Sequence, residues 1–87
     1  MGSGAFIGHK SDGSTDRWRM ENKFTTAKSF RVTLDDLTKL RGECRNAQSP
    51  VFNVDFQDKF TGATTESWVL VPHKDWEKLE NAAANNR

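Results

Sequence analysis

Three charged residues near the start of the chain are spaced so that they can act together on a phosphate ester. Glu21 and Lys23 are two residues apart, and Asp12 precedes Glu21 by nine residues. Residues two apart on a β-strand project from the same face. A carboxylate there can bind a hard divalent cation such as magnesium, and a neighbouring ammonium group can orient water or stabilise the charge on a phosphate under attack.

One carboxylate binds magnesium weakly, so a second acid has to come from a neighbouring turn. Residues 11–16, SDGSTD, are typical of a turn because glycine permits positive φ and the Asp and Ser side chains bond to their own backbone. We expect a hairpin that brings Asp12 across from Glu21, with Asp16 as the alternative acid. The triplet ExK by itself is more often a solvated surface pair.

A strand over residues 17–24 must carry this pair, because apolar and charged residues alternate there. Trp18, Met20 and Phe24 fall on one face, which we expect to lie in the core. The other face is charged and carries four residues: Arg17, Arg19, Glu21 and Lys23.

The remaining elements follow from the same periodicities. Residues 33–47 predict a helix with Thr33 at its start and one apolar stripe, Leu34, Leu37, Leu40, Cys44 and Ala47. Residues 51–60 alternate as a second half-buried strand. Residues 68–71, WVLV, are apolar on both faces and predict an inner strand. Residues 72–86 predict a closing helix that begins at Pro72.

Together these elements predict an α/β (α+β) fold, a small mixed sheet of about four strands with two helices packed on it. The 87 residues predict a single domain over 1–87, with 1–10 and 82–87 expected to be flexible. A core this small makes dimerisation a natural expectation. The single cysteine excludes an internal disulfide. No apolar run approaches the roughly 18 residues that span a bilayer, so we expect a cytoplasmic protein.

The net charge of +1 is unevenly distributed along the chain. Residues 1–32 carry six Lys/Arg against three Asp/Glu, whereas residues 33–87 carry seven against nine. The basic excess therefore coincides with the Glu21–Lys23 segment, where a positive field suits a polyanion such as DNA.

Residues 11–30, SDGSTDRWRMENKFTTAKSF, resemble the active-site region of PD-(D/E)XK nucleases, in particular small phage-type endonucleases and Holliday-junction-resolvase-like proteins. In that family an acid in a turn leads into a strand that ends in ExK. The resemblance continues through residues 31–56 and 67–79 and covers about residues 9–80. It implies a restriction-endonuclease-like core. Ser11 departs from the Gly or Pro that many relatives have before the first acid, so the choice between Asp12 and Asp16 stays open.

The resemblance also implies roles for individual residues. Asp12 and Glu21, with the main-chain carbonyl of Asn22, would bind Mg²⁺ or Mn²⁺. Lys23 would position the water that cleaves a phosphodiester, and Lys28 and Ser29 would contact phosphate. Relatives often have an N-terminal helix with a further acid, for which this chain has few residues before Asp12.

Our leading hypothesis is therefore a magnesium-dependent endonuclease of phage type that acts as a homodimer on DNA, either by cutting branched or junction DNA or by nicking. Arg17, Arg19, Lys28 and Ser29 are the expected nucleic-acid contacts. Two alternatives stay open. The first is a catalytically inactive nucleic-acid-binding module of the same fold, and the second is a small interaction or inhibitor protein.

Overall fold

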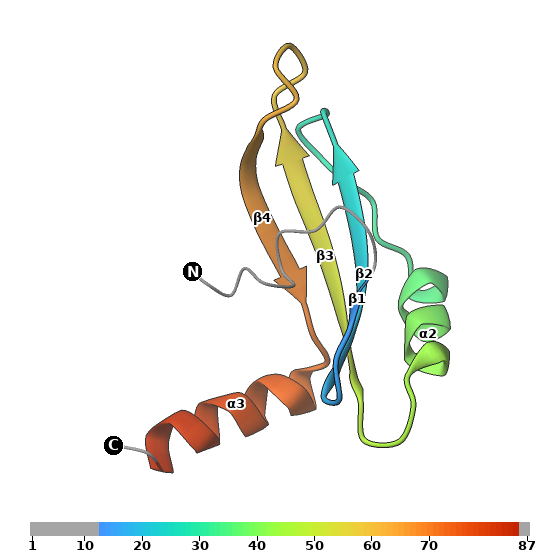
Figure 1. Cartoon of the computed structure of the whole chain (residues 1–87), viewed down its shortest axis with the longest axis vertical. Coiled ribbons are helices and arrows are strands. Elements are labelled where there is room, and N and C mark those ends of the chain that lie inside the picture. Colours follow the sequence, from blue (N-terminus) through green and yellow to red (C-terminus); the bar gives the residue numbers. More distant parts are fainter. Residues whose placement is uncertain (1–12, 86–87) are drawn as a thin grey trace.

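A computed structural model describes residues 13–85, which form a four-stranded mixed sheet with two helices (Figure 1). The α+β class with two helices is confirmed, although β1 has only two residues. The sheet order is β1-β2-β3-β4. In chain order the elements are β1 Gly13–Ser14, β2 Trp18–Thr25, α2 Leu34–Glu43, β3 Ser49–Gln57, β4 Thr64–Leu70 and α3 His73–Asn85.

The two central strands, β2 and β3, run parallel and are joined by α2. Their ladder extends from Trp18 paired with Ser49 to Thr25 paired with Phe56. Parallel neighbours need a crossover connection, and α2 provides it on one face of the sheet (Figure 1). β1 and β4 pair antiparallel with β2 and β3, respectively, and form the two edges.

Helix α2 begins where the sequence predicts and ends earlier. Thr33 is the N-cap: its hydroxyl accepts from the Asp36 amide at 3.1 Å, and the Asp36 carboxylate accepts from the Thr33 amide at 3.3 Å. The helix stops at Glu43 because Cys44 is extended and the chain turns back to start β3 beside the start of β2. Ala47, which we expected on the helix stripe, therefore lies in the connecting loop.

The core lies between α2 and the sheet. Leu40, Phe52 and Val54 are almost fully buried there, and the segment before α2 adds Phe30 and Val32. The first leucine of the expected stripe, Leu34, is 73% exposed. The buried contact of α2 is thus confined to one side of its middle and last turns.

The structure corrects which face of β2 lies under the helix. Because Glu21 pairs with Phe52 in a parallel ladder, the charged row of β2 shares a face with the apolar row of β3. Burying Phe52 and Val54 under α2 brings Glu21 and Lys23 beside the helix. Trp18, Met20 and Phe24 lie on the opposite face, where Met20 is buried but Phe24 is 58% exposed.

The opposite face also carries a chain of polar side chains across three strands. The Asn53 amide donates to Asn22 Oδ1 and, at 2.9 Å, to Asp55 Oδ1. The Ser67 hydroxyl donates to the same Asp55 oxygen at 2.6 Å. Both asparagines are buried, so these bonds satisfy groups that water does not reach.

Strand β4 was predicted as an inner strand, and this is wrong for the single chain. It is the edge of the sheet, and each of its seven residues is exposed. Trp68, Val69 and Leu70 have exposed fractions of 62%, 52% and 42%. A pattern that is apolar on both faces has therefore been placed at an open edge.

The turn from β3 to β4 is held by Asp58 and Gly62. The carboxylate of Asp58 accepts from the amides of Phe60 and Thr61 at 2.7 and 2.9 Å, and these bonds lower its pKa. Gly62 has a φ of +77°, a conformation that glycine adopts without steric cost.

Helix α3 is present as predicted but begins at His73, one residue after the expected start at Pro72, and leads away from the sheet (Figure 1). The Ser49 hydroxyl donates to Asp75 at 2.9 Å and ties its first turn to β3. No side chain of α3 is buried, and Trp76 and Leu79 stay 53% and 40% exposed. The helix continues to Asn85, into the segment expected to be flexible; residues 1–10 lie outside the described part. Among residues 13–85, no helix has the length and apolar character to cross a membrane.

Replacing Leu40 with alanine tests the location of the core. Leu40→Ala leaves a cavity between α2 and the sheet, so we expect the free energy of unfolding to fall by about 2–5 kcal/mol. Leu34→Ala, on the exposed side of the same helix, is the matched control, with an expected change within about 0.5 kcal/mol. Urea denaturation followed by circular dichroism measures both. Equal losses for the two variants would contradict the packing described above.

Candidate active site

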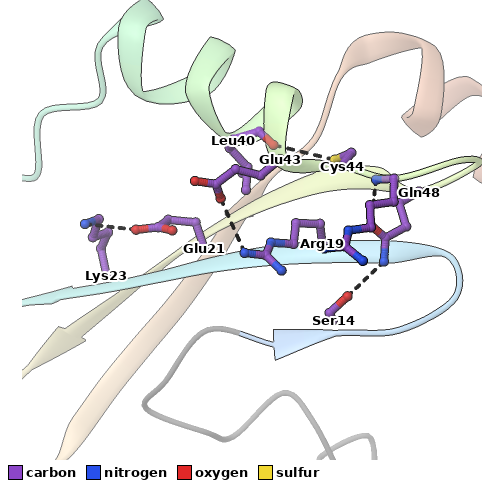
Figure 2. Close-up of polar contacts among 9 residues, drawn as sticks. Ser14, Arg19, Glu21, Lys23, Leu40, Glu43, Cys44 and Gln48 are labelled. Carbon is purple, nitrogen blue, oxygen red and sulfur yellow. Dashed lines mark hydrogen bonds and ion pairs between the residues drawn. The ribbon is translucent and has the colours of Figure 1, made fainter.

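Glu21 and Lys23 lie side by side in β2 and form an ion pair (Figure 2). Lys23 Nζ is 2.9 Å from Glu21 Oε2. The Glu21 side chain is 24% exposed and that of Lys23 46%, so both heads reach solvent at the margin of α2. The expectation that the two groups address one point above the sheet is confirmed.

The pair lines a small pocket that α2 completes with residues not anticipated from the sequence. Its volume is about 50 Å³. Besides Glu21 and Lys23, it is lined by Asp36, Lys39, Leu40, Glu43 and Phe52. Asp36, Lys39 and Glu43 are spaced three and four residues apart, which places them along one side of a helix. This spacing is the sequence feature that could have predicted their grouping. It was missed because α2 was expected on the other face of β2.

Arg19 and Glu43 form a weaker contact at the end of this pocket. One guanidinium nitrogen of Arg19 is 3.5 Å from Glu43 Oε1 (Figure 2). Arg19 Nε is buried without a hydrogen-bond partner in the described structure. A bidentate pair would use that nitrogen, so the contact is far from the strongest geometry for these groups. Arg19, an expected DNA contact, is therefore shared with a carboxylate of α2.

The structure separates the two candidates for the second acid. Asp16 lies in the turn between β1 and β2, before Trp18, and the strand from Trp18 to Glu21 spans about 10 Å. Asp16 and Glu21 cannot share one magnesium ion, whose ligand oxygens lie at about 2.1 Å from it. Asp12 lies outside the described residues. It directly precedes Gly13, whose partner in the β1–β2 ladder is Met20, the neighbour of Glu21.

The side chain of Asn22 is not part of this pocket. It points to the opposite face of the sheet and accepts a hydrogen bond from Asn53 there. The role expected for Asn22 uses its main-chain carbonyl, so the side-chain position does not conflict with it. Arg17 precedes β2, whereas Lys28 and Ser29 follow it, and eight strand residues separate them by about 26 Å.

Lys28 lines a broad groove just beyond the C-terminal end of β2, which is the end nearer to Lys23. The groove has a volume of about 770 Å³ between residues 26–28 and the β3–β4 turn. Its lining includes the basic side chains of Lys28 and Lys59 and the aromatic rings of Phe56, Phe60 and Trp68. Phe56 pairs with Thr25, two residues beyond Lys23, so the groove extends along the sheet from the Glu21–Lys23 pair.

The described part of the chain offers an incomplete ligand set for magnesium. Within residues 13–85, no three or more His, Cys, Asp or Glu side chains are grouped as metal ligands. In the pocket, Asp36 is committed to the helix cap and Glu43 to Arg19, which leaves Glu21 as the carboxylate nearest Lys23. A hard cation prefers oxygen ligands, so Glu21 fits such a site when a second acid joins it.

Cys44 lies at the end of α2, and its thiol is suited to packing rather than chemistry. Its Sγ donates to the Leu40 carbonyl oxygen at 3.6 Å (Figure 2). Partial burial raises the pKa of the Cys44 thiol, although the nearby Arg19 and Arg41 act in the opposite direction. The reactive thiolate is therefore disfavoured at neutral pH.

Alkylation of Cys44 by iodoacetamide tests this assignment. We expect the folded protein to react more slowly at pH 8 than the same protein in urea, and the pH midpoint of the reaction to lie higher when it is folded. Rates are followed by mass spectrometry across pH 7–10. A folded protein that reacts as fast as the unfolded one would show that the thiol is activated.

Comparison of the chain with protein-family models, with curated proteins and with solved structures found no match.

Proposed function

We propose that this chain is a magnesium-dependent endonuclease of the PD-(D/E)XK type that hydrolyses phosphodiester bonds in DNA. The observation that carries the proposal is the contact between Glu21 and Lys23, 2.9 Å apart at the edge of a helix-covered sheet face and open to solvent. The order of a hairpin, a strand ending in this pair, a helix and a parallel strand supports it. The same order is implied by the resemblance of residues 11–30 to that family.

In this proposal Glu21 and Asp12 hold Mg²⁺ (or Mn²⁺), with the Asn22 carbonyl as a further ligand. The bound ion would supply Lewis-acid stabilisation of the charge on the phosphate. Lys23 orients a water molecule for attack on phosphorus, since its ammonium group is held next to Glu21 and remains exposed to the substrate side. Its positive charge also stabilises the phosphate as negative charge accumulates.

DNA is proposed to lie along the groove beside the Glu21–Lys23 pair. Lys28 and Lys59 provide phosphate contacts there, and the ring of Phe60 is exposed for stacking on bases. Ser29 and Arg17 extend the contact surface to the two ends of β2. A phage-type enzyme of this kind works as a homodimer in the host cytoplasm, where its DNA substrate lies.

The two aspartates of the first turn provide a matched pair of substitutions. Asp12→Asn removes a proposed ligand, so we expect magnesium-dependent cleavage to fall at least about 100-fold, as for Glu21→Gln and Lys23→Gln. Asp16→Asn, in the turn before β2, is expected to leave the rate unchanged. The assay is nicking of linear and branched DNA with Mg²⁺ or with EDTA.

Three results would decide against parts of this assignment. Equal cleavage by Glu21→Gln, Lys23→Gln and the parent chain would refute the site. Loss of cleavage in Asp16→Asn but not in Asp12→Asn would show that Asp16, and not Asp12, is the second acid. Salt-dependent DNA binding without any metal-dependent cleavage would favour the inactive binding module.

Lys28→Ala tests the proposed DNA path. Removing one phosphate contact should weaken binding and reduce the slope of log K against log salt by about 1. Lys74→Ala, on the exposed first turn of α3, is the control for the loss of a lysine elsewhere. Fluorescence anisotropy with labelled DNA at several salt concentrations gives both slopes. Identical slopes for Lys28→Ala and the parent would place the DNA elsewhere.

A further inference from the structure

The edge strand β4 and the helix α3 that follows it expose large apolar side chains, and we call these two consecutive elements together the β4–α3 surface (residues 64–70 and 73–85). β4 exposes Trp68, Val69 and Leu70, and α3 exposes Trp76 and Leu79. Natural edge strands are usually protected by lysine, proline, a bulge or a covering element. The strand sequence TTESWVL has a single charge, Glu66, and no lysine or proline, and its one register shift, at Thr65, lies before the apolar residues 68–70.

The residue pattern of β4 is that of a strand with neighbours on both sides. Val69 lies on one face of the sheet, whereas Trp68 and Leu70 lie on the other, so apolar side chains project from both faces. Within residues 13–85 this pattern lies at an edge of the sheet, because β3 is the one strand that pairs with β4. A second strand beside β4 would convert the edge into the interior that the pattern predicts.

We propose that a second copy of this chain pairs antiparallel with β4, so that two four-stranded sheets join into one. An edge strand is self-complementary in this arrangement, because a two-fold axis places each strand against its own copy. Helix α3 follows β4 after two residues. A 13-residue helix without buried side chains is marginal in water, so α3 also gains from a partner.

The β4–α3 surface is small for a dimer interface but rich in large apolar side chains. A standard interface takes about 20–30 residues and 800 Å² from each partner. The 7 residues of β4 and the one side of the 13-residue α3 that a partner can contact stay below that number. The exposed parts of the two tryptophans alone contribute on the order of 200 Å² of apolar area. An apolar pocket of about 100 Å³ at Leu37, Leu70 and Pro72 adjoins the same edge and can receive a side chain of the partner.

This arrangement has a consequence that rests on the proposed nuclease function. The two-fold axis between antiparallel strands is perpendicular to the sheet, so both helices α2 and both Glu21–Lys23 pairs lie on one side. From β2 to its copy there are five strand intervals of about 4.8 Å, which places the pairs about 24 Å apart across the sheet. Two sites on one surface are suited to two cuts in a single branched DNA.

Light scattering during size-exclusion chromatography tests the interface without DNA or metal. We expect the parent chain to have twice the 9.9 kDa mass of the monomer. Val69→Lys places like charges across the two-fold axis and should raise the dimer dissociation constant at least about 100-fold. Leu34→Lys, an equally drastic change on the exposed side of α2, should leave the dimer intact.

Cysteine cross-linking is the second test, and it does not depend on a destabilised variant. In a Cys44→Ala background, a scan of single cysteines over positions 66–69 should give a covalent dimer on mild oxidation at the position nearest the two-fold axis, because a residue there directly opposes its own copy within disulfide distance. A cysteine at Leu34 should give none. Cross-linking at Leu34 but not in β4 would overturn the proposal, as would a dimer that Val69→Lys leaves unchanged.

Other occupants of this surface give different results. A monomeric parent chain overturns the proposal, and if Trp68→Ala then also abolishes DNA binding, a nucleotide occupies the surface instead. A dimer without cleavage keeps the interface and refutes the nuclease function. Cleavage by a strictly monomeric parent chain refutes the interface and keeps the nuclease function, so the two proposals fail independently.

Discussion

The parallel pairing of β2 with β3 determines where every charged group of the candidate site lies. Glu21 is aligned with Phe52 and Lys23 with Val54. The apolar row of β3 has to be buried, and α2 buries it, so the charged row of β2 is carried to the margin of that helix. The ion pair thus gains low-dielectric neighbours on one side and keeps solvent on the other, an environment that strengthens electrostatic interactions with a bound ligand.

Much of this arrangement could be predicted from local sequence signals. The turn before β2, the alternation of β2 and β3, the Thr33 cap and the helix after Pro72 each depend on residues close in the chain. The shared direction of Glu21 and Lys23 follows from the two-residue repeat of a strand alone. These features were therefore accessible without knowledge of the fold.

The features that were missed all depend on contacts between distant segments. Alternation in β2 shows that it has two different faces, but α2 covers the face chosen by Phe52 and Val54, about 30 residues later in the chain. For the same reason Asp36, Lys39 and Glu43 were not expected in the pocket. The pattern of Trp68–Leu70 is typical of an inner strand, whereas within residues 13–85 β4 pairs with β3 alone.

The row of buried amides behind the site has a further role in keeping the strands aligned. Asn53 bonds to Asn22 on one side and to Asp55 on the other, and Ser67 extends the row to β4. If β3 slid by two positions, Asn22 would face Val51 or Asp55 instead, and its buried Oδ1 would lose the Asn53 donor at a cost of about 1–3 kcal/mol. Apolar packing alone tolerates such sliding far better. The hydrogen bonds on the face opposite the pocket thereby fix the register between β2 and β3. The position of Glu21 depends on this register, although the bonds that fix it lie away from the substrate side.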